Sequence, residues 1–223
     1  MVRLTLSFII AMGVSRAGAF VKASRILKTV CPVDIYSSRW GVVPRPTREH
    51  IVPKKFLSSS AGADLNNIFV CTSVMNSKRG LRRFDTIHVN EKGVIVLDGS
   101  TSEVIGNGDG SMFDPRDVCL MAQNRFYPPS HARGAIARVC MYMGQTYPSF
   151  EKNIFEHVLD VNTMLLWDKM YPIQEWEIER ARNIRKLGYP RNKFVLLHEY
   201  HDYKPSRTNR YDRGGDDRGV RHK

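Results

Sequence analysis

The sequence predicts a single mixed α+β domain. A short run of β-favouring residues at 68–72 is followed directly by Ser73, a residue type that commonly begins helices. Apolar residues recur with helical spacing over 133–147, and residues 162–186 predict one or two further helices, broken near Pro172. The chain has 223 residues, of which 42% are hydrophobic, so it can bury one substantial core.

The remaining elements are expected around these. Residues 37–48 are rich in Ser, Gly, Pro and Arg and predict a loop that leads to a strand carrying His50. A further strand is expected at 92–97, followed by a glycine-rich surface loop at 99–110. That loop lacks the Gly-Lys-Ser/Thr ending of a phosphate-binding loop.

The charge of the chain points to a polyanionic partner. The formal net charge is +12 and the isoelectric point is about 9.7, which favours nucleic acid first and an anionic membrane second. Many basic proteins bind no specific polyanion, so the charge supports a nucleic-acid function without establishing one.

The N-terminus predicts a cleaved signal peptide over residues 1–19. Arg3 precedes an apolar run at 4–14, and the small residues at 17–19 form a cleavage pattern. The run is shorter than the roughly 20 residues that a membrane span needs, so no stable span is expected after cleavage. The next residues, to about 30, are basic and free of acids. Entry into the secretory route, to a secreted or periplasm-like location, is therefore the first expectation, with a plastid or mitochondrial leader as alternatives.

The cysteines and the C-terminus complete the organisation. Cysteines in a secreted chain are expected to form disulfides, and the four present allow three pairings. No two have the Cys-x-x-Cys spacing of a structural zinc site. Residues 202–223 contain almost nothing apolar and predict a disordered polar tail. The cysteines are Cys31, Cys71, Cys119 and Cys140.

The most informative feature for function is the neighbouring pair Glu49 and His50, read with Asn76. A histidine can take a proton from water near neutral pH. Carboxylate and amide oxygens are the hard ligands that Mg²⁺ or Ca²⁺ prefers. These residues have the chemistry needed to hydrolyse a phosphodiester with one divalent metal ion.

The order and spacing of these residues resemble the endonuclease I family, the secreted and periplasmic nucleases of the His-Me finger (ββα-metal) group. In that family Arg-Glu-His-x-x-Pro is followed by a block beginning Asp-Leu, with an Asn twelve positions after the Asp and an Arg three further on. Two later blocks carry Arg-Gly-x-x-Ala-Arg and a Trp helix followed by Glu-x-x-Arg-Asn. The matching residues here are Arg48 to Pro53, Asp64, Asn76, Arg79, Arg133 to Arg138, Trp167 and Glu179 to Asn183.

The resemblance implies a nuclease domain over residues 31–201, with a ββα-metal core surrounded by helices. It implies a metal-dependent, largely sequence-non-specific endonuclease that leaves 5′-phosphate on DNA, with RNA as an open alternative substrate. His50 would be the base, and Glu49 and Asn76 would hold Mg²⁺, with Ca²⁺ or Mn²⁺ as alternatives. A monomer is expected.

Further residues receive roles from the same resemblance. Arg79 is a candidate catalytic residue that contacts phosphate. Asn67 is expected either to orient the His50 ring or to make an ordinary strand or turn hydrogen bond. The nucleic-acid contacts are expected from Arg48, Lys54, Arg133 and Arg138, without base readout. The alternative for Arg133 and Arg138 is that they pack or pair inside the protein.

The chain also departs from the family pattern. Asn66 stands where the family usually has His, Lys193 where it usually has Pro, and the stretch 116–132 is longer than expected. The rival hypothesis is a catalytically silent nucleic-acid-binding module that retains the fold. Loss of His50, Glu49 or Asn76 would favour this rival, and all three are present.

Overall fold

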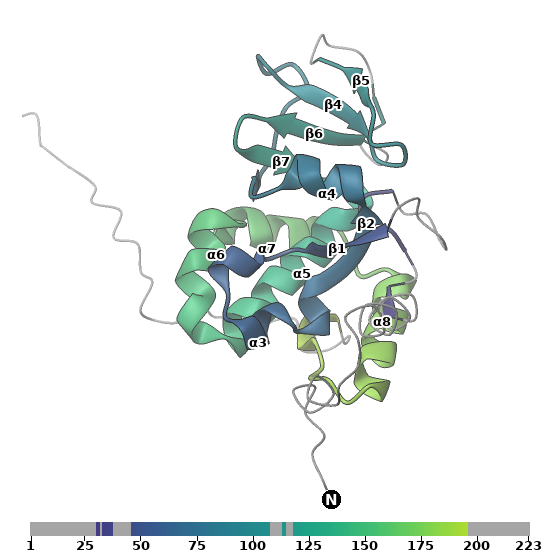
Figure 1. Ribbon diagram of the computed structural model, residues 1–223. Coiled ribbons are helices and arrows are strands. Elements are labelled where there is room, and N and C mark those ends of the chain that lie inside the picture. The colour runs from purple at the N-terminus through teal and green to yellow at the C-terminus, as the bar shows by residue number, and fades with distance from the viewer. Residues whose placement is uncertain (1–29, 32, 38–45, 108–112, 115–117, 196–223) are drawn as a thin grey trace, which may run out of the picture.

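The computed structural model describes residues 30–31, 33–37, 46–107, 113–114 and 118–195 (Figure 1). The expected leader at 1–19 and tail at 202–223 lie outside the described residues, as does most of the loop expected at 37–48. Within the described parts, helices and two sheets form one α+β domain, which confirms the predicted fold class.

The first sheet has two strands. Strand β1 (Pro46–His50) runs antiparallel to β2 (Ile68–Thr72), with His50 opposite Ile68 and Pro46 opposite Thr72. Helix α4 (Ser73–Arg79) follows β2 without a loop. The predicted strand at 68–72 is confirmed. The helix cap, however, is Thr72 rather than Ser73, because the Thr72 hydroxyl accepts from the Met75 amide at 3.0 Å.

Three short helical elements connect β1 to β2. They place the chain beside the carboxyl end of β1 before it turns back into β2. They are η1 (Lys54–Phe56), α3 (Ser59–Gly62) and η2 (Leu65–Asn67).

The second sheet has five strands in the order β3-β7-β6-β4-β5. Figure 1 shows it as the upper layer, with α4 between it and the β1–β2 pair. The strand predicted at 92–97 appears as β4, and the loop predicted at 99–110 contains β5, which pairs with β4. The strands are β3 (Arg83–Phe84), β4 (Ile95–Asp98), β5 (Val104–Gly106), β6 (Val118–Ala122) and β7 (Arg125–Tyr127).

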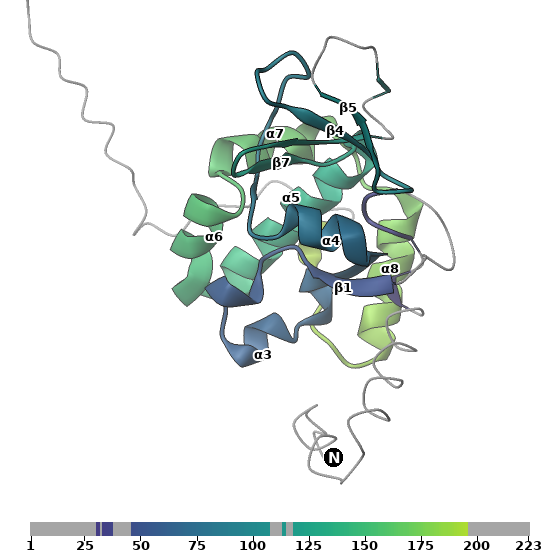
Figure 2. The same cartoon turned by 45° about the horizontal axis from the view of Figure 1, so that its top comes forward.

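Helices form the other layer (Figures 1 and 2). The helix predicted at 133–147 is α5 (Ser130–Thr146), and the break predicted near Pro172 separates α7 (Val161–Met170) from α8 (Glu175–Lys186). The layer is completed by η3 (Pro148–Phe150), α6 (Glu151–His157) and η4 (Lys193–Val195).

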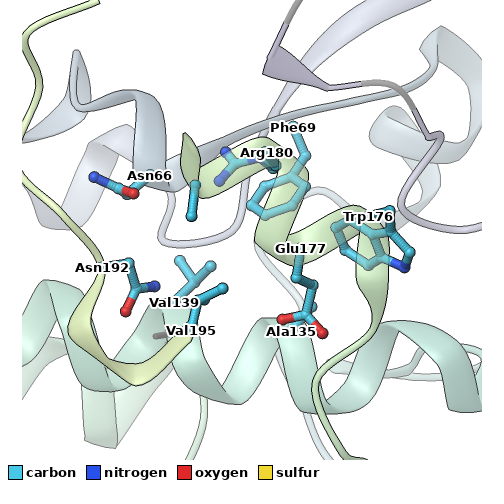
Figure 3. A pocket seen from close by; sticks show the side chains of 10 residues that line it. Asn66, Phe69, Ala135, Val139, Trp176, Glu177, Arg180, Asn192 and Val195 are labelled. Atoms are coloured by element: carbon cyan, nitrogen blue, oxygen red, sulfur yellow. The ribbon is translucent and has the colours of Figure 1, made fainter. Parts of the chain in front are cut away.

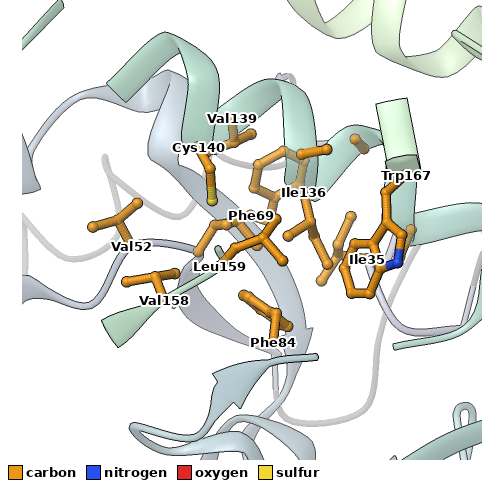
Figure 4. Packing of buried hydrophobic residues seen from close by; sticks show 14 of the residues in the cluster. Ile35, Val52, Phe69, Phe84, Ile136, Val139, Cys140, Val158, Leu159 and Trp167 are labelled. Carbon is orange, nitrogen blue, oxygen red and sulfur yellow. The ribbon is translucent and has the colours of Figure 1, made fainter. Parts of the chain in front are cut away.

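Helix α5 runs through the centre of the core. Figure 4 shows Ile136, Val139 and Cys140 of this helix facing side chains from the strands and from α7. Gly134 allows α5 to approach the segment after α7, because a Cβ at this position would lie 2.3 Å from the Tyr171 carbonyl oxygen. Trp167 is buried in the same core.

Asp64 connects this helix to the β1–β2 unit. Its Oδ1 accepts from the Asn66 amide at 2.8 Å and so caps η2. Its Oδ2 accepts from the hydroxyls of Tyr142 and Tyr147 at 2.8 and 2.9 Å. Asp64, the first residue of the Asp-Leu block, therefore fixes the start of β2 against α5.

The four cysteines do not form the predicted disulfides. All four fall within the described residues, and each is a buried free thiol. Burial raises the pKa of each thiol, so all four are protonated at neutral pH. Among the described helices, none is both long and apolar enough to cross a membrane.

The dependence of stability on pH tests the buried position of Asp34. Burial raises the pKa of its carboxyl from 3.8 to about 6. Between these values the folded protein holds a proton that the unfolded chain has released, so the free energy of unfolding falls as pH rises, by roughly 3 kcal/mol in all. Asp34→Asn should flatten this slope in urea denaturation from pH 4 to 7. Parallel profiles for variant and wild type would contradict the assignment.

Candidate active site at the β1–α4 junction

Alternation along β1 separates its two candidate residues. Successive strand side chains point to opposite faces, so Glu49 is buried, whereas His50 is half-exposed. Helix α4 packs back on this strand, and the Asn76 amide nitrogen donates to the Arg48 carbonyl at 3.1 Å. The two candidate metal ligands and the candidate base thus lie where β1 meets α4.

The His50 ring is held by the backbone of α3. Its Nε2 lies 3.1 Å from the Gly62 carbonyl oxygen. A carbonyl only accepts, so Nε2 carries the hydrogen and Nδ1 is the nitrogen with a lone pair. Burial, helped by the Lys54 and Arg48 cations, lowers the pKa of the ring to about 4. His50 is therefore neutral at neutral pH, the form that can take a proton.

Glu49 is a buried carboxylate with one oxygen occupied and one unpartnered. Oε1 accepts from the Tyr36 hydroxyl at 2.9 Å and lies 3.4 Å from Arg79 Nη1. Oε2 is buried and has no hydrogen-bond partner among the described residues. Burial raises the pKa of this carboxyl, while Arg79 and Tyr36 oppose the rise. An orphaned carboxylate oxygen fits a hard cation.

Arg79, predicted to contact phosphate, lies inside the protein. It is 2% exposed, and its guanidinium donates to the carbonyls of His50 and Ile51 at 3.1 and 2.6 Å. It also lies over the Phe84 ring at 4.5 Å. These contacts join α4 to the end of β1 and to Glu49, and they leave the Arg79 guanidinium shielded from solvent, unlike the exposed phosphate contact that was predicted.

Among the described residues, the Asn67 side chain makes no hydrogen bond to His50. Its amide accepts from the Val52 N–H at 2.8 Å and donates to the Val52 carbonyl at 2.9 Å. Of the two expectations for Asn67, the ordinary backbone hydrogen bond is the one found. The Gly62 carbonyl is the group that orients the His50 ring, and no pattern in the sequence indicated it.

The four candidate nucleic-acid contacts divide into two pairs. Arg48 and Lys54 are exposed near His50. Arg133 and Arg138 are 4% and 1% exposed, which corrects the prediction that they contact phosphates. Both pack inside the protein.

Specific internal partners hold the buried arginines. Arg138 donates to both carboxylate oxygens of Glu177, at 2.9 and 2.7 Å, and to Asp168 at 2.9 Å. Arg133 donates to the Pro128 carbonyl at 2.9 Å and lies over the Tyr127 ring.

Asn66, which departs from the family pattern, lines a small cavity between α5 and α8 (Figure 3). The cavity has a volume of about 10 Å³, enough for one water molecule. Asn66 Oδ1 and Arg180 Nε are buried there without partners among the described residues. The lining includes none of His50, Glu49 and Asn76, so this cavity is separate from the candidate active site.

Comparison with known proteins identifies the family. The sequence model of endonuclease I matches residues 43–198. The chain belongs to the endonuclease I family. The match contains β1, β2 and α4, and therefore His50, Glu49 and Asn76, but it begins after Tyr36.

The relatives with curated names match a shorter stretch. An endonuclease-1 of Buchnera aphidicola is 37% identical over 73 residues, which is 33% of this chain and 27% of that protein. A periplasmic deoxyribonuclease of Aeromonas hydrophila is 36% identical over 78 residues, 33% of this chain and 29% of that protein. An extracellular deoxyribonuclease of the same organism is 36% identical over 72 residues, 30% and 28% of the two chains. The chain thus spans less than a third of the length of each of these relatives.

Arg138 should matter for stability and not for nucleic-acid contact. Arg138→Met leaves the buried Glu177 carboxylate unpaired, so we expect a loss of about 3–5 kcal/mol in the free energy of unfolding. Arg182→Met, at an exposed position on the same helix as Glu177, should change stability little. Urea denaturation measures both. A stable Arg138 variant with weakened DNA affinity would contradict this assignment.

Proposed function

We propose that this protein is a metal-dependent endonuclease that hydrolyses DNA phosphodiester bonds with little sequence specificity. The observation that carries the proposal is the junction of β1 and α4: the half-exposed His50 follows Glu49 on β1, Glu49 keeps an orphaned oxygen, and Asn76 of α4 donates to the backbone of β1 at Arg48. Family membership and the names of the relatives support the same activity.

His50 would act as the general base. The Gly62 carbonyl holds Nε2, so the ring presents Nδ1 as the nitrogen that takes a proton from the attacking water. The lowered pKa keeps the ring unprotonated at neutral pH. A base with this pKa is weak, so its contribution depends mainly on its position beside the water.

Glu49 and Asn76 would hold the metal ion through a carboxylate and an amide oxygen. The hydrogen bond from Asn76 to the Arg48 carbonyl uses the amide nitrogen and leaves the amide oxygen for a cation. Mg²⁺ would neutralise charge on the scissile phosphate and stabilise the leaving 3′-oxygen. Ca²⁺ and Mn²⁺ have compatible oxygen chemistry.

Substrate binding would rest on phosphate contacts. Arg48 and Lys54 are exposed beside His50, and contacts to phosphate carry no base information. DNA cleavage would leave 5′-phosphate ends, and RNA remains a second substrate class to test. The periplasmic and extracellular relatives support entry into the secretory route.

The activity can be tested by plasmid nicking. The purified chain should relax supercoiled plasmid in Mg²⁺ and not in EDTA. His50→Ala should lower the rate by about 100- to 10,000-fold with DNA affinity unchanged, because the neutral ring adds no charge to binding. His88→Ala, at an exposed histidine, serves as the control. Wild-type protein that binds DNA without cutting it in Mg²⁺ would replace this proposal with the silent binding module.

A metal titration should distinguish the role of the metal ligands from that of the base. Asn76→Ala should raise the Mg²⁺ concentration for half-maximal nicking by at least about 10-fold, with excess Mg²⁺ restoring part of the rate. Ser77→Ala, at the exposed neighbouring position on α4, should behave as wild type. An unchanged Mg²⁺ titration for Asn76→Ala would remove this residue from the metal site.

A further inference from the structure

The segment at residues 33–37 lies before the part of the chain that matches the family, yet it is built into the candidate site. Asp34 forms a parallel bridge with Val70 of β2, and the Ile35 amide donates to the Val70 carbonyl at 3.0 Å. On the other side, His131 Nε2 lies 3.1 Å from the Ile35 carbonyl oxygen. The segment is therefore fixed between β2 and α5.

This placement directs Tyr36 toward Glu49. The Asp34 carboxylate accepts from the backbone N–H groups of Tyr36 and Ser37 at 2.8 and 2.9 Å, which fixes the local turn. The Tyr36 ring packs edge-on against Phe126 with ring centroids 5.3 Å apart. From this position the hydroxyl donates to Glu49 Oε1 at 2.9 Å, and the tyrosine is completely buried.

Two donors on one oxygen decide which oxygen of Glu49 remains available. Tyr36 and Arg79 both contact Oε1, whereas Oε2 has no partner among the described residues. Rotation of the carboxylate would break both contacts to Oε1. The network thus presents Oε2 as the free ligand atom in one fixed direction.

We propose that Tyr36 is a positioning residue of the metal site, so that the site includes a segment upstream of the family match. The inference rests on the proposed function, because it assigns Glu49 as a Mg²⁺ ligand. Tyr36 acts through Glu49: it holds Oε1 and thereby pre-orients Oε2. A partner that fixes a ligating carboxylate typically changes metal affinity by about 10- to 100-fold.

The competing explanation is that Tyr36 only fills the core and satisfies a buried carboxylate. Tyr142 offers a matched control for this explanation. It is also a buried tyrosine whose hydroxyl donates to a buried carboxylate, Asp64, at 2.8 Å. Asp64 is not a proposed metal ligand, so Tyr142→Phe reproduces the loss of a hydroxyl without touching the site.

The experiment compares Tyr36→Phe, Tyr142→Phe and wild type as full-length chains. Mg²⁺ binding without DNA is measured by calorimetry, and Mn²⁺ binding by electron paramagnetic resonance. Plasmid nicking is followed against Mg²⁺ concentration, with the melting temperature recorded for each chain. Tyr36→Phe should bind Mg²⁺ about 10-fold more weakly and keep its rate at saturating Mg²⁺ within about a factor of two. Tyr142→Phe should lose melting temperature and keep wild-type Mg²⁺ affinity.

Unchanged Mg²⁺ affinity in Tyr36→Phe, with wild type binding normally, would overturn the positioning role alone. Equal weakening in both variants would also overturn it, because the effect would then be general loosening. Wild-type protein that binds no Mg²⁺ would overturn the proposed metal site and this inference together. If Tyr36→Phe does not fold, Phe126→Leu removes the ring that Tyr36 packs against. Weaker Mg²⁺ binding in that variant supports the role, and wild-type affinity overturns it.

Discussion

The buried contact between Glu49 and Arg79 is the interaction on which the site geometry depends. Both side chains are almost fully excluded from solvent, and removal of each charge from water costs several kcal/mol. Arg79 offsets this cost through hydrogen bonds to the carbonyls of His50 and Ile51 and through its ion pair with the carboxylate. The same contacts tie α4 to the end of β1, the helix and strand that carry the candidate ligands and the candidate base.

A closed circuit of contacts extends from this pair into the second sheet. Arg79 lies over Phe84, whose ring is 6.2 Å from that of Phe126. Phe126 packs against Tyr36, and Tyr36 returns to Glu49 through its hydroxyl. Strands β3 and β7 therefore support a site made from β1 and α4. Because every member of the circuit is buried, a change in one packing contact is transmitted to the carboxylate.

Some basic residues of the sequence motifs lie at the candidate site and others lie in the core, and their charge alone does not predict which. Arg48 and Lys54 remain exposed, while Arg138 is one of the largest fully buried side chains. The difference arises from partners distant in sequence: Glu177 lies 39 residues from Arg138 along the chain. The same holds for Asp64, whose hydroxyl partners are Tyr142 of α5 and Tyr147 just after that helix.

The sequence by itself determined the α+β class, the strand at 68–72, the helix that follows it, the long central helix and the break near Pro172. These features depend on local periodicity and on residues with strong backbone preferences. Both can be read from residues that are close together in the sequence. The sequence also indicated His50, Glu49 and Asn76 as a group. Only the tertiary structure decided that Tyr36 holds Glu49, that the Gly62 carbonyl holds the His50 ring and that Arg79 faces inward. Burial and hydrogen bonding between segments distant in the chain set those roles, and the local order of residues does not predict which distant segments will meet.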